Sequence, residues 1–125
     1  MMKKRILIID DEAVTTRLIR LNLERTDRYE VREENDSTRA VATAQEFQPD
    51  LILLDVVMPG LDGSDVVTRL KTDAKLKNVP VVFLTATVRK TEVDAHGGII
   101  GGFSFLGKPV SAAELIECIE KNLSL

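Results

Sequence analysis

The chain has 125 residues, with 17 Lys and Arg against 20 Asp and Glu and a formal net charge of −3 at pH 7. This length suits a single domain, and the mildly acidic balance without a basic run argues against direct nucleic-acid binding. No stretch approaches the roughly 18 apolar residues of a membrane span, and the lone Cys118 excludes an internal disulfide, so we expect a cytoplasmic protein without membrane contact.

The first third of the chain predicts two strands with a helix between them. Residues 6–9 are aliphatic throughout, which is typical of a strand buried on both faces. Residues 13–26 follow as an amphipathic helix, whose apolar stripe is expected to be Val14, Leu18 and Leu21. Residues 29–32 are short and alternate polar with apolar side chains, so they predict an edge strand.

A second helix and the central strand come next. Ser37 is expected to cap the helix and Pro49 to end it. The buried stripe of this helix is predicted to be Ala40, Val41, Ala44 and Phe47. Residues 51–54 are consecutive aliphatic residues and predict a strand buried on both faces.

The following segment predicts a third helix, a fourth strand and a weak fourth helix. The third helix begins after a loop at residues 60–63 and fades near Lys75. Its apolar residues are Val66, Val67 and Leu70. Residues 79–84 predict the fourth strand. Residues 88–96 are only weakly helical, and the glycines within 97–102 each cost a helix about 1 kcal/mol relative to Ala, so this helix should be short.

A last strand and helix complete an alternating pattern. Residues 103–106 predict the strand, and Ser111 with Glu114 forms a capping box for a helix that runs to Leu123. The buried stripe of this helix is predicted to be Leu115, Ile116, Ile119 and Leu123. Strand and helix alternate five times, which predicts an α/β fold: a doubly wound, five-stranded parallel sheet flanked by helices on both faces. Residues 1–125 are expected to form one domain.

Polar residues stand where the predicted strands end. They are Asp10 and Asp11 after the first strand, Asp55 after the third, Thr85 after the fourth and Lys108 after the fifth. Because the carboxyl ends of parallel strands share one edge of the sheet, these side chains should converge. Neighbouring carboxylates repel one another, which raises the pKa of at least one of them unless a cation lies between.

Mg²⁺ is the cation that suits this group of side chains. It prefers hard oxygen ligands and is commonly held by one or two carboxylates together with a phosphate oxygen. Lys108 and Thr85 add a cation and a hydroxyl donor where a metal-bound anion would lie, and a phosphoryl group is the anion most easily explained. An aspartate at the strand end would then be the in-line nucleophile.

At these residues the chain resembles the receiver domain of two-component response regulators, which has a flavodoxin-like fold. The resemblance covers essentially the whole chain and rests on short motifs that follow the expected strands. They are Asp10-Asp11, Asp55, Met58-Pro59-Gly60 with Asp62-Gly63, Thr85-Ala86 and Lys108-Pro109. Each motif is weak alone, but together and in this order they are specific.

The resemblance implies a role for each site residue. Asp55 would accept a phosphoryl group from the phosphohistidine of a sensor histidine kinase or histidine phosphotransfer protein. The Mg²⁺ ligands would be Asp10, Asp11, Asp55 and the Val57 backbone carbonyl. Lys108, followed by a cis peptide bond before Pro109, would contact the phosphoryl group. Thr85 and Phe105 would form the switch pair, Glu12, Ala86 and Pro109 would support the site, and Val57 and Thr87 would tune hydrolysis.

Several expectations follow from this resemblance. The chain would be a signalling domain and not an enzyme with a separate substrate, although it would catalyse its own phosphoryl transfer and slow autodephosphorylation. Phosphorylation would alter the surface around the fourth helix and fifth strand. No output domain is expected in residues 1–125, so the chain would act on a target protein or belong to a larger regulator. The segment 97–102 departs from the family by one extra residue before Lys108.

Three other functions compete with that of a receiver domain. A flavodoxin-like binding protein would need a first loop rich in Ser, Thr and Gly, but here that loop is Asp10-Asp11-Glu12. A haloacid-dehalogenase-type phosphatase needs a second acid two residues after its nucleophile, where this chain has Val57. The serious alternative is a receiver-like interaction module that works without phosphorylation.

Overall fold

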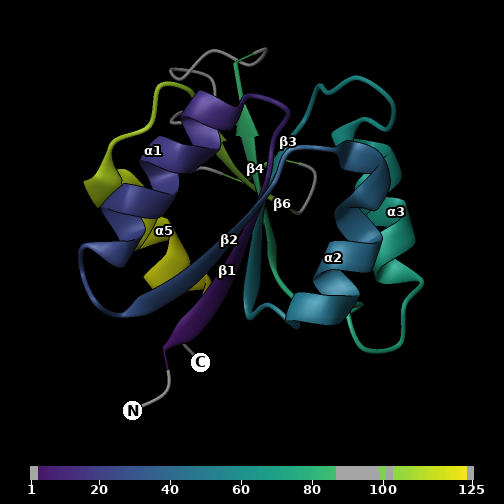
Figure 1. The fold of residues 1–125 in the computed structure, drawn as a ribbon, viewed down its shortest axis with the longest axis horizontal. Helices are drawn as coiled ribbons and strands as arrows, with labels where there is room; N and C mark the ends of the chain where they lie inside the picture. The colour runs from purple at the N-terminus through teal and green to yellow at the C-terminus, as the bar shows by residue number, and fades with distance from the viewer. Residues whose placement is uncertain (1–2, 87–98, 101–102, 124–125) are drawn as a thin grey trace.

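The computed structural model describes residues 3–86, 99–100 and 103–123 (Figure 1). Its strands are β1 (Lys4–Ile9), β2 (Tyr29–Glu34), β3 (Leu51–Asp55), β4 (Val81–Thr85), β5 (Ile99–Ile100) and β6 (Phe103–Gly107). Its helices are α1 (Ala13–Glu24), the 3-10 helix η1 (Ser37–Arg39), α2 (Ala40–Phe47), α3 (Gly63–Lys71) and α5 (Ala112–Leu123). The predicted helix at 88–96 and Thr87 lie outside the described residues.

The strands form one sheet in the order β2-β1-β3-β4-β6-β5. The first five of these pair in parallel, which confirms the predicted five-stranded parallel sheet. The edge strand predicted at residues 29–32 is β2, which extends to Glu34. The two-residue strand β5 adds an antiparallel pair beside β6, with Ile100 opposite Phe103. The sequence did not predict β5, because two residues among glycines give no strand-length apolar run.

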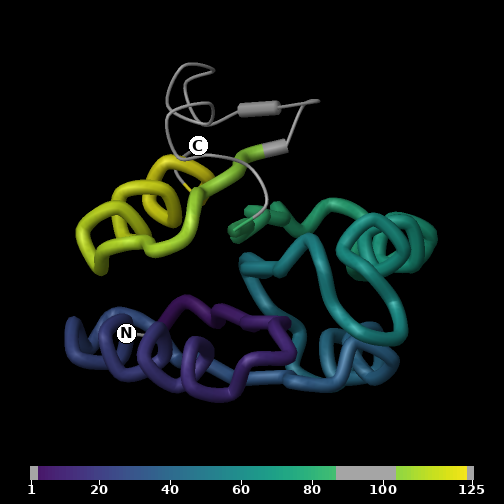
Figure 2. The backbone as a smooth tube through the Cα atoms, turned by 90° about the horizontal axis from the view of Figure 1, so that it is seen from above, coloured from purple at the N-terminus to yellow at the C-terminus, as the bar shows by residue number. Residues whose placement is uncertain are grey.

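Helices cover both faces of the sheet: α1 and α5 lie on one side, α2 and α3 on the other (Figures 1 and 2). Side chains alternate along β1, so that Ile6 and Ile8 face one layer while Leu7 and Ile9 face the other. The first pair packs in a core with residues of α1 and α5, and the second pair in a core with residues of α2 and α3. Every helix among the described residues is too short or too polar to cross a membrane.

The predicted buried stripe of α1 is wrong. Val14, Leu18 and Leu21 are 74%, 58% and 47% exposed, whereas the helix buries Thr16, Ile19 and Leu23. Burial of the Thr16 hydroxyl is possible because it donates a 2.6 Å hydrogen bond to Glu33 Oε1. The helix is therefore rotated so that a hydrogen-bonded threonine faces the sheet and a row of aliphatic side chains faces outward.

The other predicted helices differ mainly in their caps. Asp36, not Ser37, caps the start of the second helical segment, because its carboxylate accepts the Thr38 N–H, while Ser37 is buried. The α2 helix ends at Phe47, and Gln48, in the left-handed conformation at φ 54°, caps it directly before Pro49. Of its predicted stripe, Val41 is only half-buried; the buried members are Ala40, Ala44 and Phe47.

The last helix agrees best with its prediction. The Ser111–Glu114 capping box is confirmed by two reciprocal hydrogen bonds of 3.3 and 3.1 Å. Leu115 and Ile119 are buried, as predicted, and the remaining stripe positions are half-buried. This helix has a single apolar face, so its pattern admits only one orientation against the sheet.

Candidate functional site

The candidate site lies where the order of the strands reverses. β1 pairs with β2 on one side and with β3 on the other, so the crossovers leave in opposite directions and open a crevice at the carboxyl ends of β1 and β3. Asp10 directly follows β1 and Asp55 is the last residue of β3. The parallel register places Ile9 beside Leu54, which brings the two aspartates to the same edge.

Three carboxylates meet in this crevice. Asp10, Asp11 and Asp55 each offer an oxygen, and these oxygens all lie within 4.8 Å of one another. Asp10 is fully buried and Asp55 is 7% exposed, whereas Asp11 is exposed. The structure therefore assembles the acidic cluster that the sequence predicts from three separate positions.

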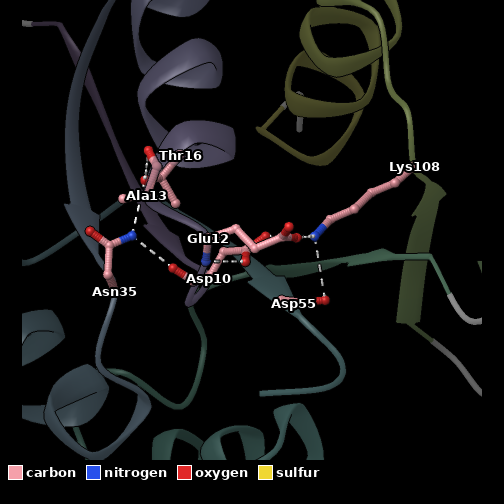
Figure 3. A network of polar contacts seen from close by, with 7 residues as sticks. All are labelled: Asp10, Glu12, Ala13, Thr16, Asn35, Asp55 and Lys108. Atoms are coloured by element: carbon pink, nitrogen blue, oxygen red, sulfur yellow. Dashed lines mark hydrogen bonds and ion pairs between the residues drawn. The ribbon is translucent and has the colours of Figure 1, made fainter. Parts of the chain in front are cut away.

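Lys108 follows β6, and its side chain extends toward Asp10 and Asp55, as Figure 3 shows. Its Nζ lies 2.6 Å from Asp10 Oδ2 and 3.6 Å from Asp55 Oδ1, with Glu12 Oε1 at 3.5 Å. Burial alone would lower the pKa of Lys108, but the hydrogen bond to Asp10 and the surrounding carboxylates outweigh it, so the pKa is raised. Lys108 is accordingly charged, and it pairs more closely with Asp10 than with Asp55.

The pKa of Asp55 is well above that of an ordinary carboxyl group. Burial, followed by repulsion from Asp10, raises its pKa to about 6, against the opposing effect of Lys108 and of the Val56 and Val57 backbone N–H groups. The single lysine therefore does not neutralise the crevice fully. This agrees with the expectation that crowded carboxylates raise the pKa of one member.

The remaining predicted site residues surround the crevice, except Thr87, which is outside the described residues. Thr85 is buried at the end of β4, and its carbonyl accepts the Lys108 N–H at 2.9 Å. The peptide bond between Lys108 and Pro109 is cis, as expected. Phe105 is half-buried and stacks on Phe83, with ring centroids 4.9 Å apart.

The flanks of the crevice carry Glu12, Val57 and Ala86. The Glu12 N–H donates to Asp10 Oδ1 at 2.9 Å, so this residue helps to orient the buried carboxylate. Val57, two residues after Asp55, is 59% exposed, and Ala86 is exposed just beyond β4. None of these residues blocks access to Asp55 with a large buried side chain.

Three residues hold the crevice together through contacts that the sequence did not predict. A Cβ on Gly63 would lie 2.7 Å from the Asp55 carbonyl oxygen, so glycine is needed for α3 to begin against the end of β3. Asn35 donates to the Asp10 carbonyl oxygen, and Ser37 bonds the loop after β3. Glycine in a turn was visible in the sequence, but nothing in the hydrophobic pattern marks a tertiary contact of Asn35 or Ser37.

Comparison with known proteins agrees with this geometry. Residues 6–120 match the family described as the response regulator receiver domain. The chain belongs to this family. Receiver domains are signalling domains of two-component systems. The family match confirms the resemblance noted in the sequence, and the observed sheet confirms the predicted fold.

Curated relatives of this receiver domain are longer proteins. The chain is 37% identical to the DNA-binding dual master transcriptional regulator RpaA of Synechocystis over 90% of its own length and 46% of that protein. It is 40% identical to the response regulator PleD of Caulobacter vibrioides over 87% of its own length and 24% of PleD. The receiver domain thus spans half or less of the length of these two relatives.

Solved structures resemble it over nearly the whole chain. The chemotaxis protein CheY4 of Vibrio cholerae superposes with a TM-score of 0.82 at 26% identity, covering 98% of this chain and 100% of that one. The receiver domain of a sensor histidine kinase from Pseudomonas aeruginosa, determined with a magnesium ion coordinated in its active site cleft, gives a TM-score of 0.82 at 25% identity, with 99% and 100% covered.

The donor set of the crevice fits a magnesium ion. Asp10, Asp11 and Asp55 supply hard carboxylate oxygens at mutual distances within 4.8 Å, which is the ligand chemistry that Mg²⁺ prefers. Among the described residues this cluster consists of carboxylates alone, whereas zinc favours nitrogen and sulfur ligands.

Proposed function

We propose that this receiver domain is a phosphoacceptor in which Asp55 takes a phosphoryl group from the phosphohistidine of a sensor histidine kinase or a histidine phosphotransfer protein. The observation that carries the proposal is the setting of Asp55: a nearly buried carboxylate at a strand end, within 4.8 Å of the carboxylate oxygens of Asp10 and Asp11 and 3.6 Å from Lys108 Nζ. This arrangement supplies a nucleophile, metal ligands and a cation at one point.

In the proposed reaction an Asp55 carboxylate oxygen attacks phosphorus in line with the leaving imidazole nitrogen. The P–O bond of an acyl phosphate forms as the P–N bond breaks, and the imidazole keeps the electron pair. Asp55 must be ionised to attack, and a pKa of about 6 leaves it mostly ionised at neutral pH. Lys108 would balance charge on a phosphoryl oxygen, with the Thr85 hydroxyl as a further donor.

Asp10, Asp11, Asp55 and the Val57 carbonyl would hold Mg²⁺. When bound, the ion supplies charge neutralisation for the transferring phosphoryl group. Asp10 contacts Lys108 Nζ at 2.6 Å. When Asp10 binds the ion, Lys108 would turn from Asp10 toward the phosphoryl oxygens. Glu12, Ala86 and Pro109 would shape the surroundings.

The switch would be the Thr85 and Phe105 pair. Phosphorylation adds about −1.5 to −2 charge beside these strand ends, which favours movement of hydrogen-bond donors toward Asp55. Phe105 is half-buried and stacks on Phe83, and in the proposed switch its ring turns inward behind the Thr85 hydroxyl. Amide chemical shifts of residues 85–86 and 103–108 should change on phosphorylation, and unchanged shifts would count against the switch.

The exposed face of α1 supports docking of a helical donor domain. Val14, Leu18 and Leu21 are spaced as a row along the helix, and α1 begins two residues after Asp11, so the row leads directly away from the site. Leu18→Glu should slow transfer from a phosphorylated histidine phosphotransfer domain at least tenfold. It should leave phosphorylation by the small donor phosphoramidate unchanged, and equal loss with both donors would contradict this surface.

Val57 is proposed to prolong the phosphorylated state. Its side chain is apolar and 59% exposed beside Asp55, so it does not orient a hydrolytic water. Val57→Asn should therefore accelerate loss of the phosphoryl group, whereas loss within seconds from the wild type would contradict the account. Thr87 belongs to the same proposal on sequence grounds alone.

The output of the domain would depend on a target protein or an output domain outside these 125 residues. One relative is named a DNA-binding regulator, but the shared region is 46% of that protein. We therefore propose a signalling role for this domain without direct nucleic-acid or membrane contact, located with its donor in the cytoplasm, and with no separate substrate.

The test is intact mass spectrometry after incubation with Mg²⁺ and phosphoramidate, with Asp55→Asn and a chelator as controls. The proposal predicts one added phosphoryl group on the wild type and none in either control. If no phosphoryl group is added and a beryllium fluoride mimic of it also fails to bind, the domain is a receiver-like interaction module that works without phosphorylation.

A further inference from the structure

Two residues of the segment 35–37, which joins β2 to the start of η1, contact two different loops of the candidate site. Asn35 Nδ2 donates to the Asp10 carbonyl oxygen at 2.8 Å and to Thr16 Oγ1 at 3.0 Å (Figure 3). Ser37 Oγ donates to the Pro59 carbonyl oxygen at 2.8 Å and accepts the Leu61 N–H at 2.9 Å. The segment therefore joins the loop after β1 to the loop after β3.

The contact of Asn35 is fixed from both sides. The Asp10 carbonyl can only accept, so the amide nitrogen must face it, and the buried Thr16 hydroxyl uses its own proton on Glu33 Oε1 at 2.6 Å and so accepts from Asn35. Arg20 in turn donates to Glu33 Oε2 at 2.9 Å. The backbone that carries the Asp10 and Asp11 carboxylates is thus tied to β2 and to the first turns of α1.

The contact of Ser37 is equally specific. Its hydroxyl is buried and both its donor and its acceptor capacity are used by the loop that follows β3. Gly60, between the two bonded residues, has φ +85°, and a Cβ there would lie 3.1 Å from Ser37 Oγ. The loop therefore fits closely over the hydroxyl, and this same loop carries the Val57 carbonyl.

We infer that Asn35 and Ser37 are positioning residues that set the spacing between the two metal-binding loops, and hence the affinity of the site for Mg²⁺. This inference rests on the proposed function, since it assumes that Asp10, Asp11 and the Val57 carbonyl bind the ion. Neither residue would touch the metal; each acts through the backbone it holds, as outer hydrogen bonds commonly do in metal sites.

The affinity of the site for Mg²⁺ and the stability of the fold can be measured separately. Metal ligands held by outer hydrogen bonds typically lose about 10–100-fold in affinity when those bonds are removed. A residue that only stabilised the fold would lower the free energy of unfolding without changing the dissociation constant of the folded protein for Mg²⁺. The two readouts therefore distinguish a positioning role from a merely structural one.

The experiment titrates Mg²⁺ into metal-free protein by isothermal titration calorimetry, for Asn35→Ala, Ser37→Ala and the double variant. Thr38→Ala is the matched control, because among the described residues the Thr38 hydroxyl bonds only to Asp36 within the same turn, at 2.6 Å. We expect each single variant to bind Mg²⁺ about tenfold more weakly and the double variant more weakly still, while Thr38→Ala stays within twofold of the wild type. Asn35 is exposed, so its variant keeps a folded test protein.

A second readout uses amide shifts of the metal-free protein. Asn35→Ala should shift residues 10–13, and Ser37→Ala should shift residues 57–61. If the wild type binds Mg²⁺ and both single variants bind it equally well, or if Thr38→Ala is weakened as much, the positioning role is wrong and the proposed function stands. If the wild type itself does not bind Mg²⁺, the proposed metal site and the positioning role both fail.

Discussion

The amino ends and the carboxyl ends of the strands differ in how their charges are arranged, and they are called here the amino edge and the carboxyl edge of the sheet. At the amino edge, opposite charges pair at the surface: Lys3 with Asp27 at 2.9 Å, Arg5 with Glu30 at 3.6 Å and Arg28 with Glu120 at 3.0 Å. At the carboxyl edge, carboxylates crowd within 4.8 Å of one another, two of them buried, around Lys108. The charges of these pairs at the amino edge balance one another, whereas the carboxyl edge has an excess of negative charge.

This difference explains why binding chemistry belongs to one edge only. Exposed, paired charges are screened by water and contribute little to stability, so they leave no demand for a ligand. Buried like charges cost free energy until a cation joins them. The unbalanced negative charge therefore lies where the strand order reverses, which is where a ligand can enter.

The largest stability effect is expected at Lys108. Lys108→Ala would leave the fully buried Asp10 without its 2.6 Å partner. Removal of one partner from a buried ion pair typically costs about 3 kcal/mol or more, and we expect a loss of that order in the unfolding free energy in chelator. Urea unfolding measures it, and addition of Mg²⁺ should recover part of the loss. A change below about 1 kcal/mol would show that the carboxyl edge is no more strained than the surface.

Asp55→Asn should have a smaller effect of the opposite sign. Asp55 binds its proton more tightly in the folded state, where its pKa is about 6, than in the unfolded chain. Its contribution to stability is therefore fully present below the unfolded pKa and lost as pH rises through about 6. The metal-free variant should be about 1–2 kcal/mol more stable than the wild type above pH 7, with the difference vanishing near pH 4. A variant less stable than the wild type at pH 8 would contradict this sign.

The smallest effect is expected at the amino edge. Arg28 and Glu120 are 56% and 52% exposed, so Arg28→Ala should change the unfolding free energy by less than about 1 kcal/mol. The change should also shrink in high salt. An effect as large as that of Lys108→Ala would remove the contrast between the two edges.

The sequence predicts the sheet and the acidic edge well, for a physical reason. Strands such as Leu51–Asp55 are aliphatic on both faces, and a carboxylate that ends such a run has few structural explanations. Parallel topology then brings distant strand ends together without any detailed packing information. The positions of Asp10, Asp55 and Lys108 could therefore be predicted before their distances were known.

The sequence was less informative where tertiary contacts decide. Hydrophobicity placed Val14 and Leu18 inside, but a hydrogen-bonded Thr16 is buried instead, because Glu33 and Asn35 from β2 and the adjoining loop satisfy its hydroxyl. Serine is a residue type that commonly caps helices, yet the Ser37 hydroxyl donates a hydrogen bond to the loop after β3, 22 residues away. These choices depend on partners from other elements, which local patterns do not reveal.

Titration of the Asp55 carboxyl carbon by NMR, with and without Mg²⁺, shows whether a metal ion completes the acidic cluster. We expect a midpoint near the raised pKa of about 6 in chelator and a clear fall when Mg²⁺ is added, because a cation bound among the carboxylates favours the ionised form. A midpoint near 4 in chelator, or one that Mg²⁺ leaves unmoved, would contradict the claim that the carboxyl edge is an acidic cluster completed by a metal ion.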